Sequence, residues 1–75
     1  MKNPVTLPII ERFLLITGWG PSRFGRAAIG DARLVTDLRA GREMQPNMEE
    51  RVRRFMLDHV EAERAKMRRL NQLVR

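Results

Sequence analysis

The sequence predicts an all-α protein, a compact four-helix domain from which a long C-terminal helix extends. Apolar residues recur three and four positions apart along most of the chain, and glycine or proline residues separate the segments that show this spacing. After Pro46 the sequence contains neither glycine nor proline and is rich in residues that favour helix. These two observations predict three short helices followed by a long one.

Length and composition set limits on the function. A chain of 75 residues makes one domain with a small core, to which a second subunit could add buried surface. The absence of cysteine excludes disulfides and thiolate metal sites, and the chain has a single histidine, so no metal or cofactor is expected. No apolar run is long enough to span a membrane, and residues 1–10 lack the features of a secretory signal. We expect a cytoplasmic, nucleoid-associated protein.

The charge of the chain points to anionic partners. Fifteen Lys and Arg residues face nine Asp and Glu residues, which gives a formal charge of +6, and thirteen of the cations are arginine. Guanidinium groups bind phosphate and the guanine edge through a planar fork of donors. A solvated basic surface is the alternative explanation.

The first two helices follow from capping residues and apolar spacing. The first helix is expected to be capped by Thr6 and to end before Gly18, with five apolar residues on its inner face: Ile9, Ile10, Phe13, Leu14 and Ile16. Trp19 is expected to cover the core. A second helix from Pro21 directs Phe24 inward, and Gly25 within it indicates either a marginal helix or the close approach of another backbone.

The third helix, residues 32–40, carries the predicted function. Asp31 is its expected N-cap, Leu34, Val35 and Leu38 face inward, and Gly41 provides a left-handed exit. Two short helices joined by a turn near residues 29–31 form a helix-turn-helix, which we assign to a DNA-binding domain over residues 1–57. The small and polar residues on the outer side of helix 32–40 suit entry into a DNA major groove.

The stretch "RFGRAAIGDARLVTDLRAGR" within residues 6–57 resembles the small bacterial members of the phage-repressor and Cro-like family (lambda repressor-like, XRE-type). The resemblance implies a transcriptional regulator that binds double-stranded DNA. It places Ala32, Arg33, Thr36 and Asp37 at base edges, and Ser22, Arg23, Arg39 and Arg42 near the DNA backbone. Helix 32–40 lacks the glutamine or asparagine that often reads adenine in this family, so the base preference stays open. Asp37 either accepts a hydrogen bond from cytosine or orients Arg33 or Arg39.

A fourth helix is expected over residues 48–73, capped by Asn47 and Glu50, with Val52 and Met56 among its core residues. Its continuation, residues 58–75, carries apolar residues at heptad spacing that predict a homodimer contact: Val60, Met67, Leu70 and Val74. Glu63 interrupts this seam, and a solvated arginine-rich tail is the alternative. His59 is expected to be a partly buried structural residue. A dimer of this kind predicts an inverted-repeat operator with half-sites about one helical turn apart.

Three function classes follow, of which we favour a sequence-specific DNA-binding regulator. The second is a protein-interaction module, such as an adaptor or antitoxin-like partner, and the third is a basic amphipathic helix on an anionic membrane surface. Catalysis is not expected, because a helix separates Asp58, Glu61 and Glu63, and Ser22 has no nearby base. No small-molecule ligand is evident.

Overall fold

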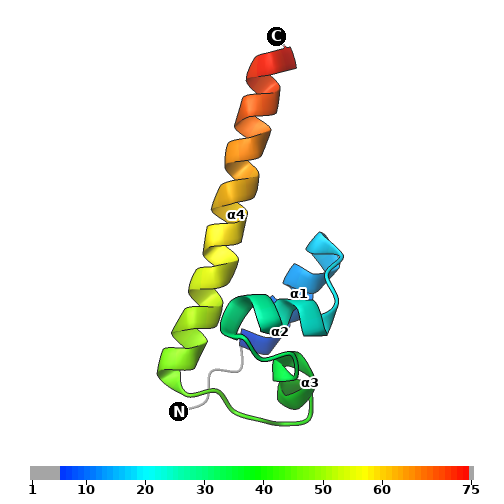
Figure 1. Cartoon of the computed structure of the whole chain (residues 1–75), viewed down its shortest axis with the longest axis vertical. Coiled ribbons are helices and arrows are strands. Elements are labelled where there is room, and N and C mark those ends of the chain that lie inside the picture. Colours follow the sequence, from blue (N-terminus) through cyan, green and yellow to red (C-terminus); the bar gives the residue numbers. More distant parts are fainter. Residues whose placement is uncertain (1–5, 75) are drawn as a thin grey trace.

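The computed structural model describes residues 6–74, and the side chains of residues 6–73. It contains four helices: α1 (Thr6–Thr17), α2 (Pro21–Ile29), α3 (Leu34–Arg39) and α4 (Pro46–Val74). The first three helices pack around the beginning of α4 and form the body of the molecule with residues 46–57. Residues 58–74, the projecting half of α4, extend beyond this body (Figure 1). Since the described residues form helices and no strand, the predicted all-α class with a long C-terminal helix is confirmed.

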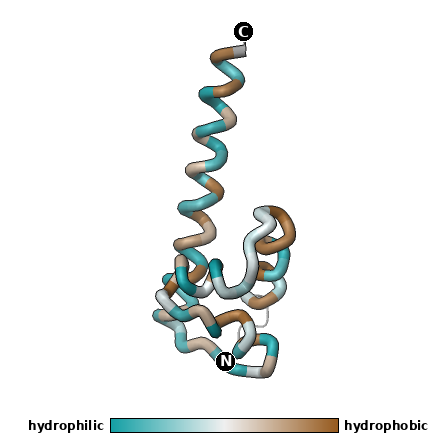
Figure 2. The backbone as a smooth tube through the Cα atoms, turned by 45° about the vertical axis from the view of Figure 1, so that its right-hand side comes forward, coloured by the Kyte–Doolittle hydropathy of each residue, from teal (hydrophilic) through white to brown (hydrophobic). Residues whose placement is uncertain are grey.

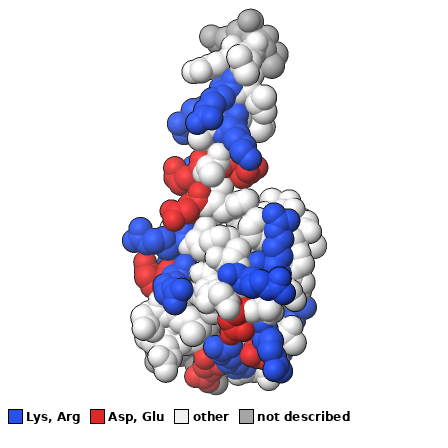
Figure 3. All heavy atoms as spheres, viewed as in Figure 1, with Lys and Arg blue, Asp and Glu red and all other residues white. Residues whose placement is uncertain are grey.

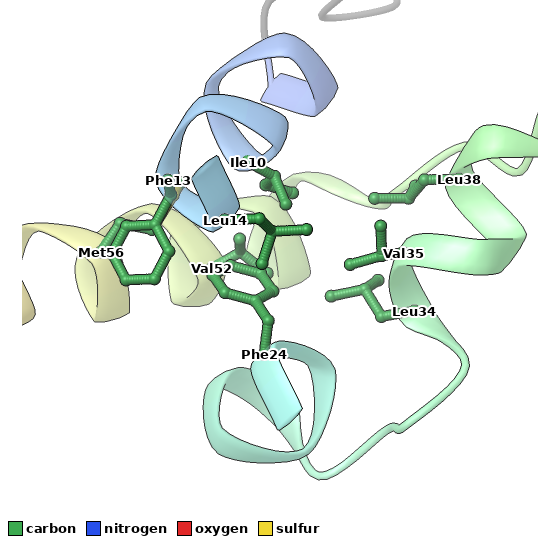
Figure 4. Packing of buried hydrophobic residues seen from close by; sticks show 9 residues of the cluster. All are labelled: Ile10, Phe13, Leu14, Phe24, Leu34, Val35, Leu38, Val52 and Met56. Carbon is green, nitrogen blue, oxygen red and sulfur yellow. The ribbon is translucent and has the colours of Figure 1, made fainter. Parts of the chain in front are cut away.

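One apolar core joins all four helices. Nine side chains are buried in it and converge from the four elements (Figure 4): Ile10, Phe13, Leu14, Phe24, Leu34, Val35, Leu38, Val52 and Met56. The ring of Phe13 lies edge-on to the rings of Phe24 and Trp19, with centroid distances of 5.3 and 5.7 Å. Trp19 is partly buried against this core, as expected of a residue that covers it.

Helix α1 ends as predicted but buries a narrower face. Gly18 adopts a φ of +76°, and its N–H donates to the carbonyl of Leu14, which closes the helix. Ile9 and Ile16 were expected in the core, but they are 45% and 77% exposed. Ile10, Phe13 and Leu14 already fill the inner face, and residues one or two positions away from them point elsewhere.

Thr6 does not cap α1 from outside. It lies in the first turn of the helix and is buried, and its hydroxyl donates a hydrogen bond to the Glu49 carboxylate on α4. The buried Thr6 hydroxyl therefore has its hydrogen-bond acceptor on a different helix.

Gly25 allows the close backbone approach that its position indicated. A Cβ atom at Gly25 would lie 2.0 Å from the carbonyl oxygen of Asp31. The Asp31 N–H donates to the Gly25 carbonyl at 3.1 Å, and Gly30 between them has a φ of +73°. The Gly30 N–H also donates to the Arg26 carbonyl at 2.9 Å, which is the 5→1 bond of an αL helix ending, and the two bonds together end α2 and hold the following turn against it.

Helix α3 is shorter than the predicted helix 32–40. Asp31 Oδ1 accepts the Arg33 N–H at 2.9 Å, and the Leu34 N–H donates to the Asp31 carbonyl at 3.1 Å. These bonds hold Ala32 and Arg33 in a turn, so the helix begins only at Leu34. Its exit is as predicted, because Gly41 has a φ of +106° and donates to the Leu38 carbonyl.

Helix α4 is continuous to Val74, as predicted, but Asn47 is not its N-cap. The helix begins at Pro46, a residue suited to the first turn, and the Glu49 N–H donates to the Gln45 carbonyl at 2.9 Å. Asn47 Oδ1 instead accepts the adjacent Met48 N–H. No helix within residues 6–74 combines the length and the apolar character needed to cross a membrane.

Candidate nucleic-acid interface

The outer side of α3 lies at the end of the molecule opposite the projecting half of α4 (Figure 1). Leu34, Val35 and Leu38 point from α3 back toward the other core residues (Figure 4). The opposite side of α3 and the turn before it therefore face solvent, with Arg33 and Thr36 exposed and Ala32 and Asp37 partly exposed. These four residues, which were predicted to meet base edges, all lie on α3 or in the turn before it and are at least partly exposed.

Arg39 links this surface to α1. Its Nε donates to Glu11 Oε2 and its Nη2 donates to Glu11 Oε1, both at 2.7 Å, so the guanidinium and carboxylate groups pair through two parallel bonds. The hydrogen bond from Arg39 lowers the pKa of Glu11, and the same bond raises the pKa of Arg39. Both side chains are exposed, so this pair orients Arg39 more than it stabilises the fold.

Arg42 follows Gly41, the residue that ends α3, and forms ion pairs with two carboxylates. Its Nη1 lies 3.1 Å from Asp31 Oδ2 and 3.3 Å from Asp37 Oδ2, which joins the turn before α3 to the helix itself. The Arg33 N–H and then the Arg42 guanidinium lower the pKa of Asp31. The Asp37 carboxylate therefore orients Arg42, and within the described residues it forms no ion pair with the guanidinium of Arg33 or Arg39, the partners that the sequence suggested.

Arg33 differs from these two arginines. Its backbone N–H is bonded to Asp31, but its exposed guanidinium has no ion pair within the described part of the chain. It lies in the turn immediately before α3, where a side chain can reach past the helix toward a ligand. Arg33 is consequently the cation of this surface that is most readily available to a base or a phosphate.

The structure divides the predicted DNA contacts into two groups. Six lie on or beside α3: Ala32, Arg33, Thr36, Asp37, Arg39 and Arg42. Ser22 and Arg23 lie in the first turn of α2, at the end remote from the turn that leads to α3. The Arg23 guanidinium lies 4.2 Å from the centre of the Trp19 ring and lines a groove beside α4.

Charges on the α3 surface balance one another in the free protein. Arg33, Arg39 and Arg42 are accompanied by Glu11, Asp31 and Asp37, three cations and three carboxylates. No sequence pattern links Glu11 to this surface, because it is 28 positions from Arg39 and belongs to another helix. The carboxylates therefore neutralise much of the positive charge of Arg39 and Arg42 at this surface.

The projecting half of α4 carries the residues predicted to form a dimer contact. Val60, Met67 and Leu70 are 41%, 60% and 54% exposed, whereas the Val74 side chain lies outside the described residues. His59 is half-buried with its ring edge-on to Phe13 and Trp19, which agrees with a structural histidine. Residues 6–73 contain no group of three His, Cys, Asp or Glu side chains able to hold a metal ion.

No protein-family model matches the chain, and comparison with curated proteins and with solved structures finds no match. The resemblance of residues 6–57 to the phage-repressor and Cro-like regulators therefore stays a prediction.

Proposed function

We propose that the protein is a sequence-specific double-stranded DNA-binding regulator that inserts α3 into the major groove and acts as a homodimer through α4. The observation that carries this proposal is the position of α3, at the far end of the molecule, with its apolar side in the core and its small and polar side in solvent. The short side chains of Ala32 and Thr36 allow a helix to approach base edges closely. Arg33, exposed and without an ion pair among the described residues, is the proposed base-reading residue.

Selection of bound fragments from a random DNA pool tests the proposal directly. We expect a short preferred sequence, and an affinity that falls steeply with salt because phosphate contacts release counterions. A chain that enriches no sequence and is indifferent to DNA at low salt would contradict the proposal and favour the protein-interaction module.

Substitution of Arg33 tests its role. Arg33→Ala should weaken binding to the selected site by about 1–3 kcal/mol and weaken binding to random DNA much less. Arg54→Ala is the matched control, because Arg54 is an exposed arginine on α4 whose loss changes the net charge equally. Equal losses on both DNAs would make Arg33 a phosphate contact.

Asp37→Asn separates the two roles open to Asp37. If Asp37 only restrains Arg42, the variant frees that arginine from one carboxylate and removes a negative charge, so affinity for all DNA should rise. If Asp37 accepts a hydrogen bond from cytosine, the variant should change the preference at one base position. Repeating the fragment selection with the variant distinguishes these outcomes.

A further inference from the structure

The large apolar side chains that are exposed within the described chain all lie on two helices. On α1 they are Ile9, Leu15 and Ile16, and on α4 they are Leu57, Val60, Met67, Leu70 and Leu73. Along the projecting half of α4, hydrophobic positions alternate with hydrophilic ones (Figure 2). In water, an amphipathic helix gains most of its stability by packing its apolar side against a partner. Among the described residues, the projecting half of α4 has no such partner.

An open groove of about 780 Å³ borders this part of α4. Its apolar lining includes Ile16 and Trp19 on one side and Val60 and Met67 on α4. Four cations and one carboxylate, Glu63, also line it, and the cations are Arg23, Arg64, Lys66 and Arg68. The chemistry that fits such a groove is an amphipathic helix with acidic side chains beside its apolar stripe.

The projecting half of α4 is itself divided by charge. Residues 58–63 contain three carboxylates and no cation, whereas residues 64–69 contain four cations and no carboxylate. Figure 3 shows the acidic side chains as a band above the body of the molecule and basic side chains beyond it toward the C-terminus. Only one exposed ion pair is formed between these two segments within the described chain, Lys66 to Glu63 at 3.5 Å.

We propose that the occupant of this surface is a second copy of the chain, with the two α4 helices antiparallel and their shared centre between Glu63 and Arg64. In a parallel pair, the basic segment 64–69 would lie beside the same segment of the other chain, and like charges would repel. In the antiparallel pair, each basic segment lies beside the acidic segment 58–63 of the second copy. Electrostatic complementarity of this kind sets the direction and register of paired helices.

The same register brings the apolar side chains together. Val60 of one chain lies level with Met67 of the second copy, and Leu57 lies level with Leu70. Glu63, which interrupts the apolar stripe of a single helix, lies level with Arg64 of the second copy. The antiparallel arrangement therefore adds a second cation, besides Lys66, next to the carboxylate that interrupts the heptad seam.

If the proposed function holds, the antiparallel pair also determines how the dimer meets DNA. The outer side of α3 faces away from the projecting half of α4 (Figures 1 and 4). An antiparallel pair consequently directs its two α3 surfaces outward from opposite ends of the dimer. Such a dimer holds two separate duplexes together, each through one short site, in place of the inverted repeat that the sequence suggested.

Cysteine cross-linking tests the helix direction without DNA. The chain has no cysteine, so Val60→Cys and Met67→Cys each introduce a single thiol on exposed positions. In the antiparallel pair two copies of residue 60 are seven residues apart along the axis, or about 10 Å, beyond the roughly 7 Å that a disulfide spans between Cα atoms. We expect at least tenfold more disulfide when the two variants are mixed than when either is oxidised alone.

Chains of different length, made with a short tag on one variant, identify the mixed product. Efficient cross-linking of each variant with itself would establish a parallel pair and overturn the proposal. A wild-type chain that sediments as a monomer at all concentrations would overturn it as well. Circular dichroism of both variants verifies that they keep the helical content of the wild type.

A bridging assay tests the consequence for DNA. Beads carrying one duplex with the selected sequence should retain a second, labelled duplex in the presence of the full chain. The double variant Val60→Asp/Met67→Asp should lose at least nine-tenths of this retention while binding a single duplex as before. A mixed cross-link without any binding to DNA would refute the proposed function and the bridging together, but would leave the antiparallel helix pair intact.

Discussion

The two halves of α4 belong to one continuous helix, yet different forces hold them. In the first half, Val52 is fully buried and Met56 is 6% exposed, because α1 and α2 pack against this side. In the projecting half, Met67 and Leu73 are 60% and 79% exposed. The helix continues past the core because no glycine or proline interrupts it, and its exposed half has local helix propensity but no tertiary partner among the described residues.

The largest expected contrast between the two regions comes from removing a leucine from each. Leu34 is fully buried, so Leu34→Ala should lower the free energy of unfolding by about 2–5 kcal/mol. Leu70 is more than half exposed, and Leu70→Ala should change the value for the dilute monomer by less than about 0.5 kcal/mol. Denaturant titration followed by circular dichroism measures both. A similar loss in both variants would mean that the projecting half packs against the body.

Substitution of Gly25 measures how much the close backbone contact between α2 and the Asp31 turn contributes to stability. Alanine normally favours a helix over glycine by about 1 kcal/mol, but here its Cβ would collide with the Asp31 carbonyl. We expect Gly25→Ala to destabilise the protein by about 1–3 kcal/mol. The neighbouring variant Arg26→Ala, at an exposed position, should have almost no effect in the same thermal melt. A Gly25→Ala protein as stable as the wild type would show that α2 and the Asp31 turn can separate freely.

Gly41 tests the exit from α3 in a similar way. Its φ of +106° is strained for any residue with a side chain, and a β-branched residue is the least tolerant. Gly41→Val should cost about 1–3 kcal/mol in thermal stability, and Gly41→Asn should cost less. Equal stability of the wild type and the valine variant would contradict this exit geometry.

Lowering the pH should have the smallest effect on stability, through ion pairs of the three short helices and the segments that follow them. Glu11 and Asp31 have pKa values below their ordinary 4.5 and 3.8, because hydrogen bonds favour their charged forms. Their contribution is complete above those ordinary values and is lost as the pH falls through the lower pKa values of the folded state. The melting temperature should therefore decline below about pH 5. Glu11→Gln should differ from the wild type at neutral pH and converge with it in acid, and a constant difference would contradict the role of the ion pair.

Much of the fold was predictable because it depends on local sequence. The ends of α1 and α3 follow from Gly18 and Gly41, and the length of α4 follows from the absence of helix-breaking residues after Pro46. The inward positions of Leu34, Val35 and Leu38 follow from helical spacing. The close approach at Gly25 was one of two explanations that the sequence allowed, and the turn at Asp31 selects it.

The candidate site was predictable only in part. The residues around α3 were identified from spacing, but Ser22 and Arg23 lie at the other end of α2, and the beginning of α3 depends on bonds made by Asp31. The Asp31 side chain bonds the backbone two residues later, which competes with an earlier start of the helix. A sequence pattern indicates that Asp31 can cap a helix, but it does not specify the residue at which that helix begins.

Local sequence specifies the four helical segments, the inward positions of Leu34, Val35 and Leu38, and the left-handed glycines Gly18 and Gly41. The packing of the helices sets the pairing of Glu11 with Arg39, the hydrogen bond from Thr6 to Glu49, and the exposure of the remaining apolar residues of α1. Helical periodicity is a property of residues three or four positions apart, and it acts within one segment. Pairing between residues 28 or 43 positions apart depends on how helices pack, which is set by the shapes of their core side chains taken together.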